Sequence, residues 1–346
     1  MKITIVLPFV NLTGGIRVML DYGNWLHEAG HKVTCVYPEW PYRFQLTRQQ
    51  QRGEHEKQLA SAPLVPWFDL RCRLARVPLI EDRHLEDADL VIAAGWPTTY
   101  DVARLRPSRG RKVQIVFHHE TGTGPERRIR GSYRLPFHRI AFSDFVRGSV
   151  AQFGCVISEV VPNGVDTARF YADGDPEPHS VLWLYHPDPR KGADDALRAL
   201  CRLKCRMPEL RVTVCGTVRP QQLPAWMPFE FHVSDDTLRK RYSAATALLY
   251  PSRCEGFGLP PLEAMACGCP SVTTSVGAIP EYAENRRNAL IVAAGDVDAM
   301  VDRLEELLDD ERLRQRLSAA GLATAERFAL SRVAPLFANA LMRACG

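Results

Sequence analysis

Two adjacent basic side chains, Arg190 and Lys191, stand in the segment HPDPRKG at residues 186–192. The segment follows a short apolar run typical of a buried strand, and it precedes a helical pattern. An arginine grips phosphate oxygens with a planar fork of donors, whereas a lysine acts as a point charge. An exposed basic turn is the alternative, but the position directly after a strand favours a binding site for an anion.

Two carboxylates, Glu255 and Glu263, flank a glycine-rich loop in the segment EGFGLPPLE. Its prolines suit the first turn of a helix, so Glu263 should lie about one turn into that helix. Carboxylates at both ends of such a loop can accept hydrogen bonds from a polyhydroxylated ligand such as a sugar or a ribose. Two solvated surface acids are the alternative. The residues whose backbone amides we expect to face the ligand are Gly256, Phe257, Gly258 and Leu259.

A glycine pair, Gly14 and Gly15, lies between the first apolar run and the first helical pattern, in the segment NLTGGI. Glycine lets the backbone approach a ligand, and the start of a helix offers free N–H groups and a positive dipole end. A phosphate fits there, although a turn without a ligand fits the segment equally well. The pattern is not G-x-G-x-x-G, which disfavours an NAD-dependent dehydrogenase.

A fourth candidate segment, His118-His119-Glu120, follows the apolar run at residues 113–117. Adjacent side chains in extended chain point to opposite sides, so we expect one of the two histidines to face a ligand. A zinc site is disfavoured, because no H-x-x-x-H pattern or cysteine pair lies next to them in the sequence. A structural histidine is the other alternative.

The elements that must position these side chains form two series of alternating strands and helices, the second restarting at residue 181. This order predicts an α/β protein with two Rossmann-like domains, each a doubly wound parallel sheet. The turn-forming segment VVPNGVD places the boundary near residue 165, giving domains of residues 1–165 and 166–329. The expected strands are residues 2–7, 32–36, 90–93, 113–117, 181–185, 210–215, 247–250, 271–274 and 289–292, and the expected helices are residues 16–28, 193–205, 238–245, 300–308, 313–328 and 333–342, with one more after Pro260.

The 346 residues are 46% hydrophobic and 24% charged, which is the composition of a globular protein. The net charge is +4, with basic side chains outnumbering acidic ones by 22 to 16 in residues 1–165. No stretch has the ~20 apolar residues that cross a bilayer, and the N-terminus lacks the features of a signal peptide. We therefore expect a cytoplasmic protein whose ten cysteines are reduced thiols.

Basic and aromatic residues gather at two places in the first half, residues 67–76 and residues 126–140. One interpretation is peripheral contact with anionic lipid at the inner face of a membrane, or with a lipid-linked diphosphate acceptor. The other is a solvated face beside ordinary core aromatics. Nucleic-acid binding is disfavoured because no recognised module is present and the net charge is small. The arginines of the second place are Arg127, Arg128, Arg130, Arg134 and Arg139.

Taken together, these segments resemble the retaining glycosyltransferases of the GT-B fold, family 4, also called group 1. The stretch PSRCEGFGLPPLEAMACGCPSV is similar to the family's E-x7-E segment in spacing and flanks, and HPDPRKG to its basic phosphate loop. VVPNGVD resembles the interdomain junction, VGAIPEYAENRRNALIVAAGDVDAM the downstream segment, and GGIRV the N-terminal glycine loop. The chain departs from the family in having LYHPDPRKG where many members have a Gly-Arg-containing segment.

The resemblance implies a role for each matching residue. Gly15 would place its amide beside the donor diphosphate, which Arg190 and Lys191 would neutralise as it leaves. Glu263 would bind ribose hydroxyls and Glu255 the donor sugar. The implied catalytic residues are His118 (or its neighbour His119), Arg190, Lys191 and Glu255, and the implied donor-binding residues are Gly14, Gly15, Gly256, Phe257, Gly258, Leu259 and Glu263.

The resemblance also implies an architecture and an activity. Residues 1–165 would form the acceptor domain, with the C-terminal helix at residues 330–346 packing back on it. Residues 166–329 would form the nucleotide-sugar domain across a central cleft. The implied reaction moves a hexose from a nucleotide-diphosphate sugar to a hydroxyl of a glycan, lipid-linked or small-molecule acceptor. No cofactor or metal is expected, since Arg190, Lys191 and the helix start at Gly15 would supply the positive charge at the diphosphate.

Two other functions fit the same motifs. A sugar-nucleotide epimerase on a similar fold would isomerise its donor with no acceptor present. A catalytically silent subunit would bind the nucleotide sugar without turnover. The presence of Glu255, Glu263 and Lys191 argues against the silent subunit.

Overall fold

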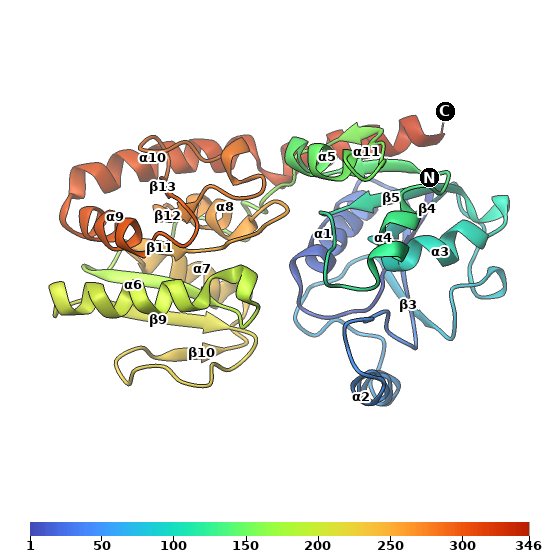
Figure 1. Cartoon of the computed structure of the whole chain (residues 1–346). Helices are drawn as coiled ribbons and strands as arrows, with labels where there is room; N and C mark the ends of the chain where they lie inside the picture. The colour runs from blue at the N-terminus through green and yellow to red at the C-terminus, as the bar shows by residue number, and fades with distance from the viewer. Residues whose placement is uncertain (346) are drawn as a thin grey trace. The chain divides into compact units, whose positions relative to one another are not determined.

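The computed structural model describes residues 1–345, which divide into two compact units (Figure 1). The first comprises Met1–Asn163 and the C-terminal residues from Val333, and the second comprises Gly164–Arg332. The predicted domain boundary near residue 165 lies beside this division. Most of the last helix, α11 (Leu330–Cys345), belongs to the first unit.

The first unit is built on a parallel sheet in the order β3-β2-β1-β4-β5-β6-β7. Its strands are β1 (Lys2–Val6), β2 (Lys32–Pro38), β3 (Arg73–Val77), β4 (Leu90–Ala94), β5 (Arg111–Val116), β6 (His138–Ala141) and β7 (Glu159–Val160). Its helices, besides α11, are α1 (Gly14–Glu28), α2 (Arg48–Ala60), α3 (Trp96–Arg104), α4 (Glu126–Ser132) and α5 (Asp144–Ala151), with 3-10 turns at Asp82–His84 and Pro107–Arg109.

The second unit has a parallel sheet in the order β10-β9-β8-β11-β12-β13. Its strands are β8 (Ser180–Tyr185), β9 (Arg211–Gly216), β10 (Phe229–Phe231), β11 (Ala247–Tyr250), β12 (Ser271–Thr274) and β13 (Leu290–Val292). Its helices are α6 (Ala193–Arg206), α7 (Asp235–Ala244), α8 (Leu259–Ala266), α9 (Val297–Asp309) and α10 (Glu311–Arg327), with 3-10 turns at Pro189–Lys191 and Ile279–Glu281.

Helices cover both faces of the second sheet, as the continuous apolar runs of its strands require. Successive residues point to opposite faces, so Trp183 packs with α6 and α9 while its neighbour Leu182 packs with α7 and α8. The first sheet follows the same rule, since Val6 belongs to the core on the α3 face and Ile5 approaches α1 at Gly23. The predicted α/β class with two doubly wound parallel sheets is confirmed.

Several elements were not predicted, chiefly in the first unit. The segment at residues 67–76, interpreted as a candidate membrane contact, leads into the strand β3. Its arginines have partners within the unit: Arg71 pairs with Glu28, Arg73 with Glu86, and the Arg76 guanidinium donates to the Ser61 carbonyl (2.7 Å). These arginines are therefore paired within the first unit.

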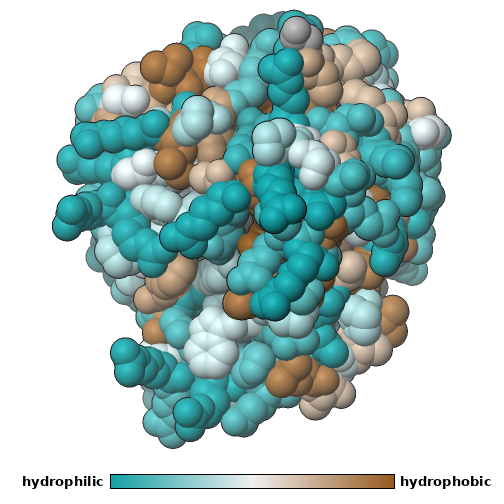
Figure 2. All heavy atoms as spheres, turned by 90° about the vertical axis from the view of Figure 1, so that its right-hand side faces the viewer, coloured by the Kyte–Doolittle hydropathy of each residue, from teal (hydrophilic) through white to brown (hydrophobic). Residues whose placement is uncertain are grey.

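Two surface properties bear on membrane contact. Among residues 1–345, no helix is long and apolar enough to cross a bilayer. The face shown in Figure 2 is mostly hydrophilic, with hydrophobic side chains scattered over it in small groups. Scattered apolar side chains are normal for a protein surface.

Candidate functional site

The loops that carry the predicted basic and acidic residues follow neighbouring strands of the second sheet. The strand order reverses between β8 and β11, and ligands of doubly wound sheets bind beyond the carboxyl ends of strands at such a reversal. HPDPRKG follows β8 and EGFG follows β11. Lys191 and Glu255, 64 positions apart in sequence, consequently meet at one edge of the sheet.

The loop after β8 forms the 3-10 turn Pro189–Lys191, which holds the two basic residues. The Asp188 carboxylate caps the turn by accepting a hydrogen bond from the Arg190 N–H (2.9 Å). The same carboxylate also accepts a hydrogen bond from the Arg190 guanidinium, whose Nη2 lies 2.6 Å from Oδ2. Hydrogen bonding to this guanidinium lowers the pKa of Asp188 to about 2. Arg190 is thus committed to Asp188, and it is Lys191 that contacts the acidic loop.

Backbone contacts lock the two loops together. The Arg190 carbonyl accepts a hydrogen bond from the Arg253 N–H (2.7 Å). Gly192 has a φ of +67°, and a Cβ placed there would overlap the Pro251 carbonyl oxygen, so only glycine fits. The Arg253 side chain makes two hydrogen bonds (2.7 and 2.8 Å) to Asp195, a fully buried acid in the first turn of α6. These contacts leave the loop after β11 little freedom.

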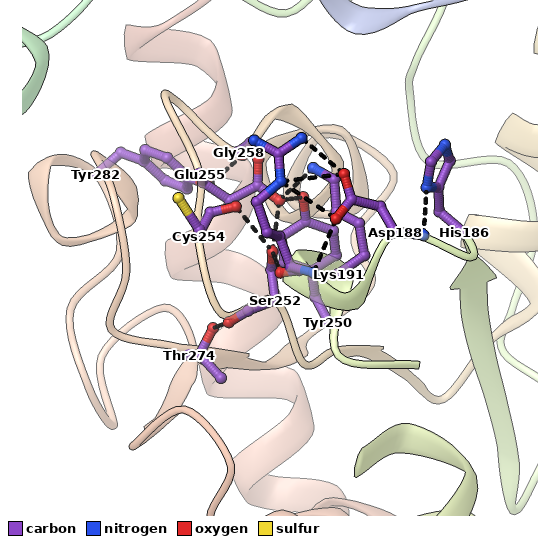
Figure 3. Close-up of polar contacts among 11 residues, drawn as sticks. His186, Asp188, Lys191, Tyr250, Ser252, Cys254, Glu255, Gly258, Thr274 and Tyr282 are labelled. Carbon is purple, nitrogen blue, oxygen red and sulfur yellow. Dashed lines mark hydrogen bonds and ion pairs between the residues drawn. The ribbon is translucent and has the colours of Figure 1, made fainter. Parts of the chain in front are cut away.

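Glu255 is the centre of the polar cluster in Figure 3. Its Oε1 accepts from the Lys191 ammonium (2.7 Å), the Ser252 hydroxyl (2.7 Å) and the Tyr250 phenol. The Glu255 side chain is 9% exposed, whereas that of Lys191 is 34% exposed. Burial, with the Glu255 charge as the second cause, raises the pKa of Tyr250 well above its usual value, so the phenol stays a donor. The cluster therefore combines a Glu255 carboxylate that is fixed by three hydrogen bonds with a solvent-accessible Lys191 ammonium.

Glu263 lies one turn into α8, as predicted, and is buried. Its Oε2 accepts a hydrogen bond from the buried Tyr242 phenol (3.0 Å). Burial raises the pKa of Tyr282 well above its usual value, and the charges of Glu255 and Glu263 raise it further. Buried tyrosines therefore lie around both carboxylates and keep their protons.

The glycine-rich loop between the two carboxylates is packed against the segment after β12. The Gly256 carbonyl accepts from the Ala278 N–H (3.1 Å), and the Gly258 carbonyl accepts from the Tyr282 phenol (Figure 3). The Phe257 ring stacks on Tyr282 with centroids 5.4 Å apart. Gly258 is the N-cap of α8 and Leu259 its first residue. The four residues whose amides we expect to face a ligand thus form the approach to a helix start.

In the first unit, the glycine pair begins α1 directly after the loop that follows β1. The N-cap Thr13 makes no side-chain hydrogen bond to this turn within the described residues. A Cβ added to Gly15 would stand 3.6 Å from the Phe117 ring, so the loop after β5 approaches the glycine pair. Gly14 and Phe117 lie at the carboxyl ends of β1 and β5, on the two sides of the strand-order reversal between β1 and β4.

The structure distinguishes the two adjacent histidines. The His119 Nε2 lies 3.0 Å from Glu126 Oε1, and its Nδ1 lies 3.0 Å from the Tyr133 hydroxyl. Its ring stacks on Phe153 with centroids 3.9 Å apart. Both His119 nitrogens therefore have partners within the first unit.

Glu120 is a functional candidate to which sequence reasoning assigned no role. Its half-buried Oε1 accepts a hydrogen bond from the Trp96 N–H (3.3 Å) at the start of α3. Burial raises the pKa of Glu120 to about 7, despite that hydrogen bond, which lowers it. The carboxyl stands at the carboxyl ends of β4 and β5, and it titrates near neutral pH.

The second unit gathers the predicted Lys191, Glu255 and glycine-rich loop, while Arg190 turns to Asp188. Ser252 and the buried tyrosines were missed. The sequence indicated two of them only by their position: Tyr250 ends the strand at the reversal, and Ser252 follows it. Among residues 1–345, no three His, Cys, Asp or Glu side chains form a group that could hold a metal.

Comparison with known proteins agrees with this geometry. The family model described as glycosyl transferases group 1 matches residues 176–323, and that described as glycosyltransferase family 4 matches residues 12–169. The chain is 32% identical over 275 residues to the lipopolysaccharide core biosynthesis mannosyltransferase of Rhizobium meliloti, covering 69% of this chain and 76% of that relative.

Two further proteins match over most of the chain. A GDP-mannose-dependent alpha-(1-6)-phosphatidylinositol monomannoside mannosyltransferase of Mycolicibacterium smegmatis is 29% identical over 343 residues, covering 89% of each chain. The crystal structure of HepE from Anabaena in complex with UDP-glucose superposes with a TM-score of 0.77 at 15% identity, covering 99% of each chain. The last match confirms the GT-B fold. The chain belongs to the group 1 glycosyltransferases of family 4.

Proposed function

We propose that this protein moves a hexose from a nucleoside-diphosphate sugar to a hydroxyl group of an acceptor. The observation that carries the proposal is the Lys191–Glu255 contact at the strand-order reversal of the second sheet. It places an accessible ammonium where a doubly wound sheet binds ligands. A leaving diphosphate develops negative charge, and a cation already in position stabilises that charge without reorganisation.

The other residues take roles that follow from their places. Glu263, whose Oε2 accepts a hydrogen bond from Tyr242, binds the ribose hydroxyls, and Glu255 binds the donor sugar. The amides of the glycine-rich loop line the sugar–phosphate site at the start of α8. Arg190 joins Lys191 at the diphosphate once it exchanges Asp188 for phosphate oxygens. No metal is needed in this scheme, since the chain's own cations neutralise the leaving group.

The first unit contributes two groups in this proposal. Gly15, at the start of α1, directs its amide to the donor diphosphate, because a helix start carries N–H groups without intrahelical partners. His118 contacts the sugar. Retention of the anomeric configuration follows from a front-face reaction in which the departing phosphate takes the acceptor proton. A trapped glycosyl-enzyme adduct, which a double displacement requires, would contradict this mechanism.

The first donor to test is GDP-mannose. The Rhizobium and Mycolicibacterium relatives are named as mannosyltransferases, and the second is named as GDP-mannose-dependent. HepE was solved with UDP-glucose, so uridine nucleotides are the natural comparison. A donor that is isomerised without any acceptor would instead indicate an epimerase.

The test is a calorimetric titration with GDP, UDP, dTDP and ADP on the wild-type protein and on Lys191→Ala. We expect selective binding of one diphosphate, weakened by the substitution on the order of ten- to a hundredfold, as for a lost bond between charged groups. A matched control is Lys240→Ala, an exposed lysine on α7 of the same unit that pairs with Asp236 (2.7 Å). This control should bind as the wild type does.

Two results would overturn the proposal. The wild-type protein could bind none of the diphosphates, which would make a silent subunit the better interpretation. Alternatively, Lys191→Ala could bind the diphosphate as tightly as Lys240→Ala does, which would show that the Lys191 ammonium does not contact the diphosphate. With the preferred donor in hand, Lys191→Ala should slow transfer on the order of a hundredfold.

A further inference from the structure

Helix α4 and the residues after it carry an arginine cluster on the surface of the first unit. Arg127, Arg128, Arg130 and Arg134 are exposed. The fifth arginine of the predicted cluster, Arg139, is buried and donates through Nε to Gln114 (3.0 Å), so it belongs to the core. The cluster on the surface is therefore confined to α4 and Arg134.

The cluster has little negative charge to balance it. Glu126 is the acid of α4, and it already holds the Arg130 Nε (2.6 Å) and the His119 Nε2 (3.0 Å). Within residues 1–345, no carboxylate lies in ion-pair range of Arg127, Arg128 or Arg134. These three residues, called the α4 arginine patch below, present positive charge to the solvent.

Another arginine-rich feature of the same unit shows the contrast. A cavity of about 750 Å³ is lined by four arginines, and each has a carboxylate partner. The pairs are Arg83–Glu81 (2.9 Å), Arg104–Asp101 (3.2 Å), Arg106–Asp82 (3.4 Å) and Arg109–Asp87 (2.7 Å). That cavity is balanced in charge, so it offers a weaker attraction for an anion than the α4 arginine patch.

Aromatic rings hold one arginine of the patch in place. The Arg128 guanidinium lies 5.1 Å from the Phe44 ring, 5.2 Å from the Tyr100 ring and 5.8 Å from the Trp96 ring. A guanidinium stacked on rings is fixed in position, yet stacking uses none of its N–H donors. No hydrogen bond joins this guanidinium to another residue of the described chain. Its donors remain for the oxygens of a ligand.

The patch lies beside the sheet edge where a ligand is expected. Trp96 begins α3 directly after β4, and its N–H donates to Glu120, in the loop after β5. The chain then passes so close to Trp96 that a Cβ on Gly124 would overlap the indole ring. Arg128 therefore stands next to the carboxyl ends of β4 and β5, near the loop that carries His118.

We propose that Arg127 and Arg128 bind a phosphate group carried by the acceptor, so that the acceptor is a phosphorylated molecule. A phosphate suits the patch because it carries up to two charges and several acceptor oxygens, which match the N–H donors of Arg128 and the charge of Arg127, its neighbour in sequence. The inference rests on the proposed glycosyl transfer and adds to it the chemical class of the acceptor. The phosphate belongs either to a lipid headgroup or to a small soluble ester.

The test compares three forms of the full chain. These are the wild type, the double variant Arg127→Gln/Arg128→Gln, and a control double variant, Arg312→Gln/Arg316→Gln. The control arginines are exposed on α10, and among residues 1–345 neither has a carboxylate in ion-pair range. One arm measures sedimentation with phosphatidylcholine vesicles, with and without phosphatidylglycerol. The other arm titrates glycerol 3-phosphate, with glycerol as the uncharged comparison.

The patch variant should lose binding on the order of tenfold or more in whichever arm the wild type binds, while the control keeps it. Binding in the vesicle arm alone identifies a lipid source, and binding of glycerol 3-phosphate identifies a soluble one. The proposal is overturned if the wild type binds in neither arm, or if the patch and control variants behave alike.

Nucleoside-diphosphate binding is measured in the same three proteins and should be equal in all of them. That result also shows that the second unit of the patch variant is folded. If all three bind the nucleotide but none binds a phosphate ester, the acceptor inference fails and the proposed transferase function stands. If the wild type binds no nucleotide, the proposed function fails independently of the patch.

Discussion

At the scale of single residues, Glu120 shows how burial creates a group that titrates near neutral pH. Burial raises the pKa of its carboxyl to about 7, whereas a glutamate in the unfolded chain titrates near ~4.3. Between these values the folded protein binds a proton that the unfolded chain has released. Stability should therefore fall as the pH rises from about 4.3 to about 7, and stay level above that.

The variant Glu120→Gln removes this dependence and keeps an oxygen to accept from the Trp96 N–H. We expect the variant to gain stability relative to the wild type as the pH rises from about 5 to about 8, by roughly 1–3 kcal/mol. Urea unfolding of both proteins over this pH range measures the difference. A difference that does not change with pH would show that the environment of Glu120 does not raise the pKa of its carboxyl.

The residue types of the site could be predicted from the sequence, but their partners could not. Lys191 and Glu255 stand out because both lie in loops that follow strands, where ligands of doubly wound sheets bind. Tyr250 does not, since an aromatic residue ending a strand is typical of a core. Its phenol becomes a donor to Glu255 through the turn between them. In the same way, the partners of His119 become visible only when α4 is placed.

At the scale of elements, two strands that are buried on every residue were predicted well, and a strand that carries two arginines was missed. β11 and β12 have the predicted bounds, because both are buried on every residue between loop segments. β3 contains Arg73 and Arg76, which hide its strand pattern. It lies at the edge of its sheet, where long charged side chains reach partners and solvent.

The close approach of the loops after β8 and β11 makes Gly192 a test of the site's architecture. Gly192→Ala combines a φ of +67° with an overlap onto the Pro251 carbonyl oxygen. We expect it to cost more than the ~1–2 kcal/mol of left-handed strain alone, and to weaken nucleoside-diphosphate binding by displacing Lys191. Denaturant unfolding and calorimetry measure the two effects.

The matched control is Gly174→Ala in the same unit. Gly174 also has a positive φ, +93°, but an added Cβ would meet open space. It should show the conformational strain without the overlap, and it should bind nucleotide as the wild type does. If the two variants lost equal stability and equal nucleotide affinity, the contact between the two loops would have no consequence for the site.

At the scale of the whole molecule, the chain returns at its C-terminus to the unit where it began. Phe337 of α11 is fully buried in the first unit, against Tyr22 (centroids 4.3 Å apart) and Phe142 (6.2 Å). Arg343 of the same helix pairs with Glu159 of β7 (2.7 Å). The first unit therefore depends on residues from two distant parts of the sequence, whereas the second is continuous in sequence.

Truncating Phe337 should therefore destabilise one unit selectively. We expect Phe337→Ala to cost about 3–5 kcal/mol, the usual loss for a buried aromatic side chain. Leu336→Ala is the control, because the Leu336 side chain, next in sequence to Phe337, is 47% exposed. This substitution should change the free energy of unfolding by about 0.5 kcal/mol or less. Hydrogen exchange read by mass spectrometry separates the units: amides of β1 and β4 should exchange faster in Phe337→Ala, and those of β8 and β11 should not. Faster exchange in both sheets would show that the two units unfold as one.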